Sequence, residues 1–152
     1  MSSLEIRPVG AADESEWRRL WTLYLAFYKT ELPEAVFAST FARVISGETN
    51  EYAGLLAVHQ GQPVGLVHYL FHRSCWSVEN VCYLQDLYVD EAVRGTGAGR
   101  ALIEAVYAAA DQAGCPSVYW HTQHFNYAGR RLYDRVASLT PFLRYDRQKA
   151  EA

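Results

Sequence analysis

A glycine-rich turn between an apolar run and a helical run constrains this chain more than any other feature. The apolar run "VCYLQDLYV" covers Val81–Val89, and the turn "RGTGAG" covers Arg94–Gly99. From Ala98 onward, apolar side chains recur at helical spacing, so the segment predicts a strand, a tight turn and a helix. Such a turn brings free backbone N–H groups and the positive end of a helix dipole to one point. It is therefore a candidate anion site, most often for a phosphate or pyrophosphate.

Three phosphate-binding motifs compete for this turn. A P-loop requires a lysine after its last glycine, and this chain has Arg100 there. A Rossmann fingerprint requires G-x-G-x-x-G in the first strand–helix unit, whereas Gly95, Gly97 and Gly99 are spaced two apart and come late. The pattern R-x-x-G-x-G, formed by Arg94, Gly97 and Gly99, fits the residues as they stand. A flexible glycine loop without a ligand is the remaining interpretation.

The rest of the chain predicts a mixed α/β domain without repeats or linkers. We expect a strand at Leu4–Val9, helices over 13–29 and from Pro33 to Gly47, two strands within Tyr52–His72 joined at "HQGQ", a strand at Val81–Val89, a helix after the glycine turn, a strand at Ser117–Thr122, a helix over 126–136 and a last strand at 142–147. Asp13 and Glu16 form a capping-box pattern at the start of the first helix. One domain over residues 1–148 with a polar tail at 149–152 is predicted.

Composition narrows the function classes. No apolar run approaches the roughly 18 residues that a membrane span needs, and the first residues lack the pattern of a signal peptide. Three scattered cysteines without a C-x-x-C pattern favour a reducing, cytoplasmic location. The net charge of −3 and the lack of a basic stripe argue against nucleic acid as a partner. Neither a membrane nor a nucleic acid is therefore an expected partner.

Two histidines in "HTQHFN", His121 and His124, are candidate metal ligands or an acid/base pair. A zinc site needs three or four ligands, and no third histidine or cysteine lies close in the sequence. We therefore expect no metal. An acid/base role for either imidazole stays open beside the simpler interpretation of a strand end followed by a loop histidine.

Two segments together resemble one known superfamily. "LYVDEAVRGTGAGRALIEAVYAAADQAG" is similar to the pyrophosphate-binding segment of the general N-acetyltransferase (GNAT) superfamily. "NYAGRRLYDRVA" is similar to the segment that follows it, with an Asn and a Tyr at Asn126 and Tyr133. The resemblance covers nearly the whole chain. "GLVHYLFHRSCW", "CYLQDLYVD" and "PSVYWHTQHFN" more narrowly resemble the branch of histone/polyamine and diamine acetyltransferases.

The resemblance implies a GNAT fold, in which about four helices flank a mixed central sheet and two parallel strands splay apart. Acetyl-CoA would lie in that splay as the co-substrate, without a metal. The residues expected to contact it are Leu87, Tyr88, Val89, Arg94, Gly95, Thr96, Gly97, Ala98, Gly99, Arg100, Asn126 and Tyr133. The backbone groups of Leu87 and Val89 would bind the pantetheine and the acetyl carbonyl, and the amides of the turn would bind the pyrophosphate. Asn126 would bind the cofactor arm, cap the helix, or do both.

The resemblance also implies direct attack of a neutral amine on the thioester. Tyr133 matches the acid that protonates the leaving thiolate. Diamine acetyltransferases carry a Glu where this chain has Gln85, so the base is assigned to Asp86, with Glu79 or a water chain as alternatives. Strand alternation puts Asp86 on the opposite face from Gln85 unless a bulge intervenes, and the resemblance implies a bulge here.

The acceptor is expected to be a primary amine: a small-molecule amine, an amino acid or a polyamine. Candidate substrate contacts are Tyr24, Tyr28, Glu31, Trp76 and Gln85. Lys29 stands where diamine acetyltransferases carry an acidic residue, which weakens the polyamine interpretation. A lysine or N-terminal amine of a protein is an alternative acceptor, and a non-catalytic acyl-CoA-binding module is an alternative function. A homodimer is expected, with 142–147 as a possible joining strand.

Overall fold

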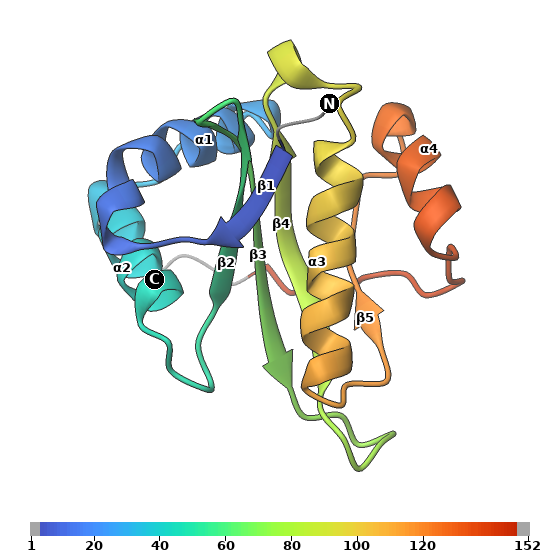
Figure 1. The fold of residues 1–152 in the computed structure, drawn as a ribbon. Coiled ribbons are helices and arrows are strands. Elements are labelled where there is room, and N and C mark those ends of the chain that lie inside the picture. Colours follow the sequence, from blue (N-terminus) through green and yellow to red (C-terminus); the bar gives the residue numbers. More distant parts are fainter. Residues whose placement is uncertain (1–3, 149–152) are drawn as a thin grey trace. The chain divides into compact units, whose positions relative to one another are not determined.

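The computed structural model describes residues 4–148, which divide after His121 into two compact units (Figure 1). The first unit contains a five-stranded sheet with the strand order β1-β2-β3-β4-β5. The strands are β1 (Leu4–Pro8), β2 (Ala53–His59), β3 (Gln62–His72), β4 (Val81–Val89) and β5 (Val118–Tyr119). Neighbouring strands are antiparallel from β1 to β4, whereas β5 is parallel to β4. The sheet is thus mixed, as predicted.

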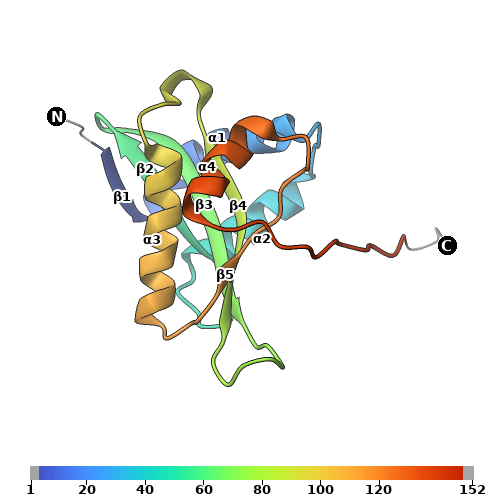
Figure 2. The ribbon, with the colours of Figure 1, turned by 90° about the vertical axis from the view of Figure 1, so that its right-hand side faces the viewer.

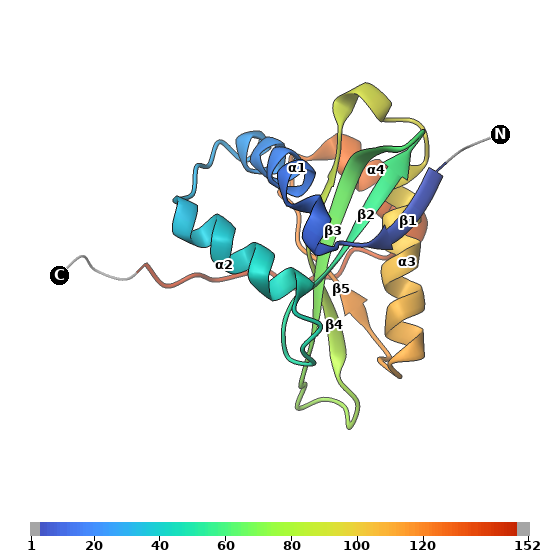
Figure 3. The same ribbon diagram turned by 60° about the vertical axis from the view of Figure 1, so that its left-hand side comes forward.

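Helices cover both faces of this sheet. The helices α1 (Glu14–Phe27) and α2 (Glu34–Ile45) lie together on one face, and α3 (Ala98–Gln112) runs along the other (Figures 2 and 3). Alternation along β3 explains the two layers, because Leu66 packs in the core with α1 and α2, whereas Gly65 faces Leu102 of α3. The core between the sheet and the first two helices includes Trp17, Leu20, Trp21, Leu25, Phe41, Val44, Leu56, Leu66 and Tyr88.

The hairpin predicted at "HQGQ" is confirmed. Gln60 and Gly61 form a two-residue connection between β2 and β3, with φ values of 52° and 79°. Positive φ at both central positions is the conformation that suits the twist of a tight antiparallel hairpin.

The predicted capping box at the start of the first helix is wrong. The side chain of Asp13 makes no capping bond within α1. Its carboxylate instead accepts bonds from the Arg7 guanidinium at 2.8 and 3.0 Å and from the Gly10 N–H at 2.7 Å. Arg7 on β1 therefore outcompetes the helix for this carboxylate, because two bonds from a guanidinium are stronger than a single bond from a backbone N–H.

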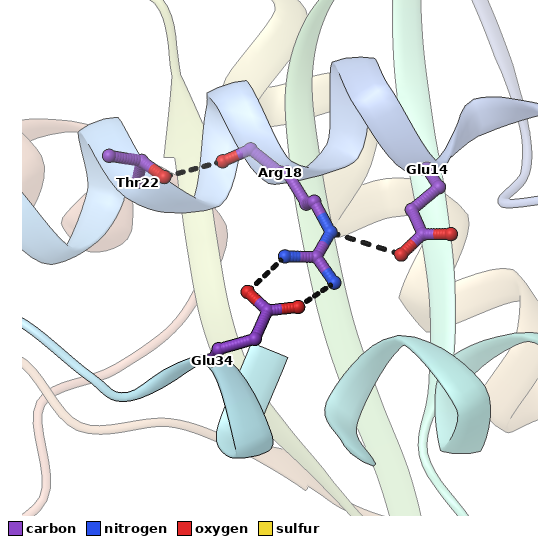
Figure 4. Close-up of polar contacts among 4 residues, drawn as sticks. All are labelled: Glu14, Arg18, Thr22 and Glu34. Carbon is purple, nitrogen blue, oxygen red and sulfur yellow. Dashed lines mark hydrogen bonds and ion pairs between the residues drawn. The ribbon is translucent and has the colours of Figure 1, made fainter. Parts of the chain in front are cut away.

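Arg18 links the first two helices through charged contacts (Figure 4). Its guanidinium binds both carboxylate oxygens of Glu34 on α2 at 2.7 and 2.8 Å, and it binds Glu14 on α1 at 3.0 Å. The Thr22 hydroxyl donates to the Arg18 carbonyl at 2.7 Å. The two helices are thereby linked at the surface, where solvent screens such pairs and weakens them.

A bulge in β4 changes which side chains share a face. Tyr69 pairs with Leu84 and His68 pairs with Asp86, so Gln85 is the extra residue on β4. The bulge implied by the resemblance is confirmed. Because one residue is skipped, Asp86 lies opposite His68 on the face that α1 covers.

The second unit begins at Thr122 and contains α4 (Tyr127–Val136). Asn126 caps this helix, because its Oδ1 accepts from the Gly129 N–H at 3.3 Å, and its Nδ2 donates to the Thr122 hydroxyl at 3.0 Å. The capping role predicted for Asn126 is confirmed. The strand predicted at 142–147 is wrong, since this segment is irregular in the structure. The predicted tail at 149–152 lies outside the described residues.

Across residues 4–148, no helix combines the length and the apolar character that a membrane crossing requires.

Candidate active site

The glycine turn presents the start of α3 to an anion. Gly95 and Gly97 have φ values of 93° and 85°, in the left-handed region that favours glycine. The first bond of the helix runs from the Ala101 N–H to the Gly97 carbonyl at 2.9 Å. The N–H groups of the preceding residues, 98–100, therefore have no acceptor within the helix. They point out of its positive end, which is the arrangement that binds phosphate groups.

The side chains of the turn contribute less than its backbone. Arg94 lies 3.5 Å from Glu91, and Arg100 lies 2.9 Å from Glu104. Both arginines are about half exposed, and each already has a carboxylate partner close by in the chain. The Thr96 hydroxyl donates to the Val93 carbonyl at 2.8 Å and so stabilises the turn itself. An anion here would be held mainly by main-chain N–H groups.

The parallel strands β4 and β5 separate after a short stretch of pairing. Their ladder contains only Cys82 with Val118 and Tyr83 with Tyr119, whereas β4 continues to Val89. The predicted strand at Ser117–Thr122 is accordingly shorter in the structure. Beyond Tyr83, this edge of β4 has no strand partner among the described residues. The backbone N–H and C=O groups along this edge suit an extended ligand that binds beside the strand through main-chain hydrogen bonds.

Asp86 lies at the centre of a cluster of polar and aromatic side chains beside this open edge. Its Oδ2 is 2.9 Å from His68 Nδ1, and His68 Nε2 is 2.9 Å from Nε1 of Trp17. The phenol of Tyr24 also lies beside Asp86. Because Asp86 is partly exposed and His68 is fully buried, the chain of bonds runs from the core to an accessible carboxylate.

Two tyrosines adjoin the Asp86 carboxylate, Tyr24 on α1 and Tyr28 directly after this helix. Burial, the negative charge of Asp86 and the hydrogen bond to it raise the pKa of Tyr24 well above its ordinary value. Burial and the same charge raise the pKa of Tyr28, which the hydrogen bond with Tyr24 partly opposes. The two rings lie 5.1 Å apart. Both phenols thus remain neutral, and the carboxylate provides the negative charge of the cluster.

A second aromatic group lies where β4 and β5 separate. Tyr83 stacks on Tyr119 at 4.8 Å, and the Tyr119 hydroxyl is 2.7 Å from His72 Nε2. His121 Nδ1 lies 3.3 Å from the Tyr83 hydroxyl, so this imidazole is at the mouth of the splay. His124 belongs to the second unit and its carbonyl accepts from Arg130 at 2.7 Å. Within residues 4–148, no three His, Cys, Asp or Glu side chains gather as a metal site would require.

The structure brings together only some of the residues predicted for the acceptor. Tyr24, Tyr28 and Asp86 form one cluster, whereas Gln85 is exposed at the bulge and Glu31 is exposed between α1 and α2. Trp76 is 88% exposed in the loop between β3 and β4.

That loop also carries Glu79, and it lies at the opposite end of β4 from the glycine turn (Figure 1). Five residue steps of β4, from Val81 to Asp86, roughly 16 Å of strand, separate that loop from Asp86. Asp86 is therefore closer to the glycine turn than Glu79 is, and its role as the base stays a prediction.

The predicted contacts of the second unit lie on one helix. Asn126 precedes α4 and Tyr133 is seven residues later, so two helical turns place them on the same side of α4. The side chain of Tyr133 is partly buried. Its role as an acid stays a prediction.

Several residues of the two groups were not predicted from the sequence as polar partners, namely Trp17 and His68 beside Asp86, and His72, Tyr83 and Tyr119 where β4 and β5 separate. One signal was available for His68, which is the single histidine in the apolar run "VGLVHYLF". A buried polar group in such a run needs a partner, although the sequence does not say which one.

Comparisons with known proteins agree on the family. The sequence profile of the acetyltransferase (GNAT) family matches residues 17–137. A D-amino-acid N-acetyltransferase from Saccharomyces cerevisiae is 43% identical over 144 residues, which cover 93% of this chain and 89% of that protein.

Solved structures share the fold at low sequence identity. A ribosomal-protein-alanine N-acetyltransferase from Brucella melitensis biovar Abortus 2308 superposes with a TM-score of 0.81 at 20% identity, over 97% of this chain and 99% of that one. The aminoglycoside N-acetyltransferase AAC(6')-Iy, solved with a CoA-linked bisubstrate analogue, has a TM-score of 0.84 at 17% identity, over 98% and 100% of the two chains.

The finer resemblance to the histone/polyamine and diamine branch is not supported by these relatives. The superfamily, the α/β fold and the enzyme class predicted from the glycine turn and the Asn126–Tyr133 segment are confirmed. The chain belongs to the acetyltransferase (GNAT) family and is an N-acetyltransferase.

Proposed function

We propose that this N-acetyltransferase transfers the acetyl group of acetyl-CoA to the α-amino group of a free amino acid. The observation that carries the proposal is the arrangement along β4, where an anion-binding turn follows the strand and a partly exposed carboxylate, Asp86, lies within it. The turn suits the pyrophosphate of CoA, and the carboxylate suits an ammonium group. The 43% identical relative named for acetylation of D-amino acids supports this choice of acceptor.

Acetyl-CoA would lie along the open edge of β4. The main chain of Leu87, Tyr88 and Val89 would bind its pantetheine arm, and the amides of 94–100 would bind its pyrophosphate. The residues fit this co-substrate because the edge lacks a strand partner and the start of α3 has N–H groups without helical acceptors. Asn126 and Tyr133 are proposed as further contacts of the cofactor.

The proposed reaction is a direct transfer. Asp86 removes a proton from the acceptor ammonium, and the neutral nitrogen attacks the thioester carbonyl carbon. The carbon–sulfur bond then breaks, and the CoA thiolate takes a proton from the Tyr133 phenol. The products are an N-acetylated amine and free CoA. Gln85, Tyr28 and Glu31 are proposed to contact the acceptor.

A free amino acid suits the mixed charges around α1 better than a polyamine does. Lys29 directly follows Tyr28, and its φ of 54° places it at the end of α1, where the Lys29 and Thr30 N–H groups bind the carbonyls of Ala26 and Leu25. A cation beside the acceptor site disfavours a polycation but suits the carboxylate of an amino acid. The polyamine branch therefore ranks below an amino-acid acceptor.

We further propose that the protein is a cytoplasmic homodimer. All three cysteines are free thiols, and two of them, Cys82 and Cys115, are buried, as suits a reducing compartment. Phe142, Leu143 and Tyr145 are exposed in the segment after α4, which supports a self-association surface.

An activity screen tests the acceptor. Purified protein is mixed with acetyl-CoA and a thiol reagent, and CoA release is followed with amino acids of both hands, polyamines and lysine peptides. We expect the highest kcat/KM with free amino acids. A polyamine or a peptide as the best acceptor would contradict the proposed substrate. Binding of acetyl-CoA without thiol release on any amine would leave only a binding module.

A further inference from the structure

A buried chain of hydrogen bonds ends at Asp86, and the chemistry of its members fixes its direction. The indole Nε1–H of Trp17 can only donate, and it lies 2.9 Å from His68 Nε2. Nε2 must therefore offer its lone pair, so the imidazole proton is on Nδ1. Since Nδ1 lies 2.9 Å from Asp86 Oδ2, His68 donates to the carboxylate. The chain thus runs from Trp17 through His68 to Asp86.

The surroundings of His68 hold its ring in this one orientation. Its side chain is 1% exposed, and its ring centre lies 5.9 and 6.1 Å from those of Trp17 and Trp21. Gly54 on the neighbouring strand leaves room for the ring, because a Cβ there would lie 3.3 Å from His68 Cδ2. A ring flipped by 180° would place carbon atoms at both bonded positions and lose both hydrogen bonds. One orientation is therefore favoured.

Few ionisable groups face the His68–Asp86 pair. Tyr24 and Tyr28 approach from α1, with their pKa values raised by burial and by the charge of Asp86. The other α1 contacts are indoles, and β2 contributes Gly54. Among residues 4–148, neither a lysine nor an arginine forms an ion pair with Asp86. The imidazole of His68 is therefore the basic group that contacts this carboxylate.

We propose that His68 is a positioning residue for acetyl transfer: Trp17 locks it in its Nδ1–H tautomer, and in that form it orients Asp86 toward the acceptor ammonium. This role rests on the proposed function, because the orientation of Asp86 matters only if the amine meets it. A neutral donor leaves the full charge of the carboxylate available to the ammonium. An imidazolium would neutralise that charge, and the Trp17 N–H prevents it by occupying Nε2 with a donor.

Two substitutions of His68 separate hydrogen bonding from packing. Asn places an amide N–H near the position of Nδ1 and keeps a neutral donor, whereas Leu fills space without one. We expect His68→Leu to raise KM for the amine at least about tenfold, since a hydrogen bond to a charged group is lost. KM for acetyl-CoA should stay unchanged. The acid limb of kcat/KM for the amine should move to higher pH, because a carboxylate without its donor takes up a proton more easily.

His68→Asn should recover most of this loss. Equal losses in the two variants would overturn the proposal, because the donor would then not matter. Wild-type behaviour of His68→Leu in both KM and pH profile would overturn it as well, since His68 would then only fill space.

A spectroscopic test needs no activity and uses the wild-type protein. In ¹⁵N-labelled protein at neutral pH, the His68 signals, assigned by their loss in His68→Asn, should show Nδ1 protonated and Nε2 unprotonated. In Trp17→Phe, which keeps an aromatic ring but no indole N–H, Nε2 should carry a proton under the same conditions. A protonated Nε2 in the wild type, or an unchanged tautomer in Trp17→Phe, would overturn the proposal. Failure of the wild type to acetylate any amine would instead remove the proposed function and leave the tautomer result intact.

Discussion

Tyr133 is the residue whose proposed role depends most on a single atom. Tyr133→Phe removes the phenol oxygen and keeps the ring, so we expect kcat to fall about a hundredfold or more, as befits the loss of a general acid. The Kd for acetyl-CoA should change little. Tyr127→Phe on the same helix, where the side chain is 65% exposed, is the control. Undiminished turnover of Tyr133→Phe, measured by thiol release, would remove Tyr133 from the acid role.

Gly54 occupies a position where no larger side chain fits. A Cβ there would lie 2.5 Å from Val44 Cγ1 and 3.3 Å from the His68 ring. Gly54→Ala should therefore lower the free energy of unfolding by roughly 1–3 kcal/mol through overpacking. Gly10→Ala, whose added Cβ would meet only an Asp13 oxygen at 3.5 Å, is the matched control. Urea unfolding of both variants measures the difference, and equal stability would contradict this packing argument.

The sequence predicted which single residues belong to the site better than it predicted their hydrogen-bond partners. Asp86 and Tyr24 were identified as site residues, but His68 was not identified as the link between Asp86 and Trp17. The reason is physical, because Trp17 and His68 are 51 residues apart and meet only after α1 packs on β3. Asp13 shows a different error, since a capping pattern suggested a helix cap, whereas Arg7, six residues earlier on β1, binds the carboxylate instead.

The start of α3 is an element whose backbone conformation should matter for binding. Gly97 and Gly47 both have positive φ, 85° and 72°, with nothing within 4 Å of an added Cβ. Alanine at either position should cost about 1 kcal/mol of stability from left-handed strain alone. Only Gly97→Ala should also weaken acetyl-CoA binding, because it shifts the amides at the start of α3. Urea unfolding and calorimetric titration check the pair, and equal effects on binding would contradict the anion-site role.

The ion pair between Arg7 on β1 and Asp13 before α1 should make the free energy of unfolding depend on pH. The bonds from Arg7, opposed by burial and assisted by the Gly10 N–H, hold the pKa of Asp13 below its usual range. The pKa of this carboxyl is lower in the folded state than in the unfolded state, where it is about 3.9. The charged pair therefore stabilises the fold fully at pH values above the unfolded pKa, and this stabilisation is lost as the pH falls through the folded pKa. Asp13→Asn should therefore cost about 1–2 kcal/mol at neutral pH.

That loss should shrink when unfolding is measured at about pH 3, where the wild-type carboxyl begins to lose its charge. Asp111→Asn, at an exposed position on α3, is the control, and it should change the free energy of unfolding little at either pH. A pH-independent loss in Asp13→Asn would contradict the charged pair as its cause.

At the element scale, regular segments were predictable and irregular ones were not. The strands up to Val89 and the helices followed from periodicity, because their apolar spacing matches the faces they bury. The length of β5 could not be predicted from periodicity, since it depends on where β4 and β5 separate. The alternating segment 142–147 forms no strand in the structure, because a strand requires a pairing partner that alternation alone does not supply.

At the scale of the whole molecule, the exposed segment after α4 predicts self-association. Phe142, Leu143 and Tyr145 are 73%, 84% and 93% exposed, and contiguous exposed apolar side chains favour association. We expect the wild type to sediment as a dimer at micromolar concentration. The double variant Phe142→Glu with Leu143→Glu should sediment as a monomer, because buried carboxylates oppose the interface. Val78→Glu, at an 88% exposed position in the β3–β4 loop, should remain dimeric. A monomeric wild type, or a double variant that stays dimeric, would contradict this surface as the interface.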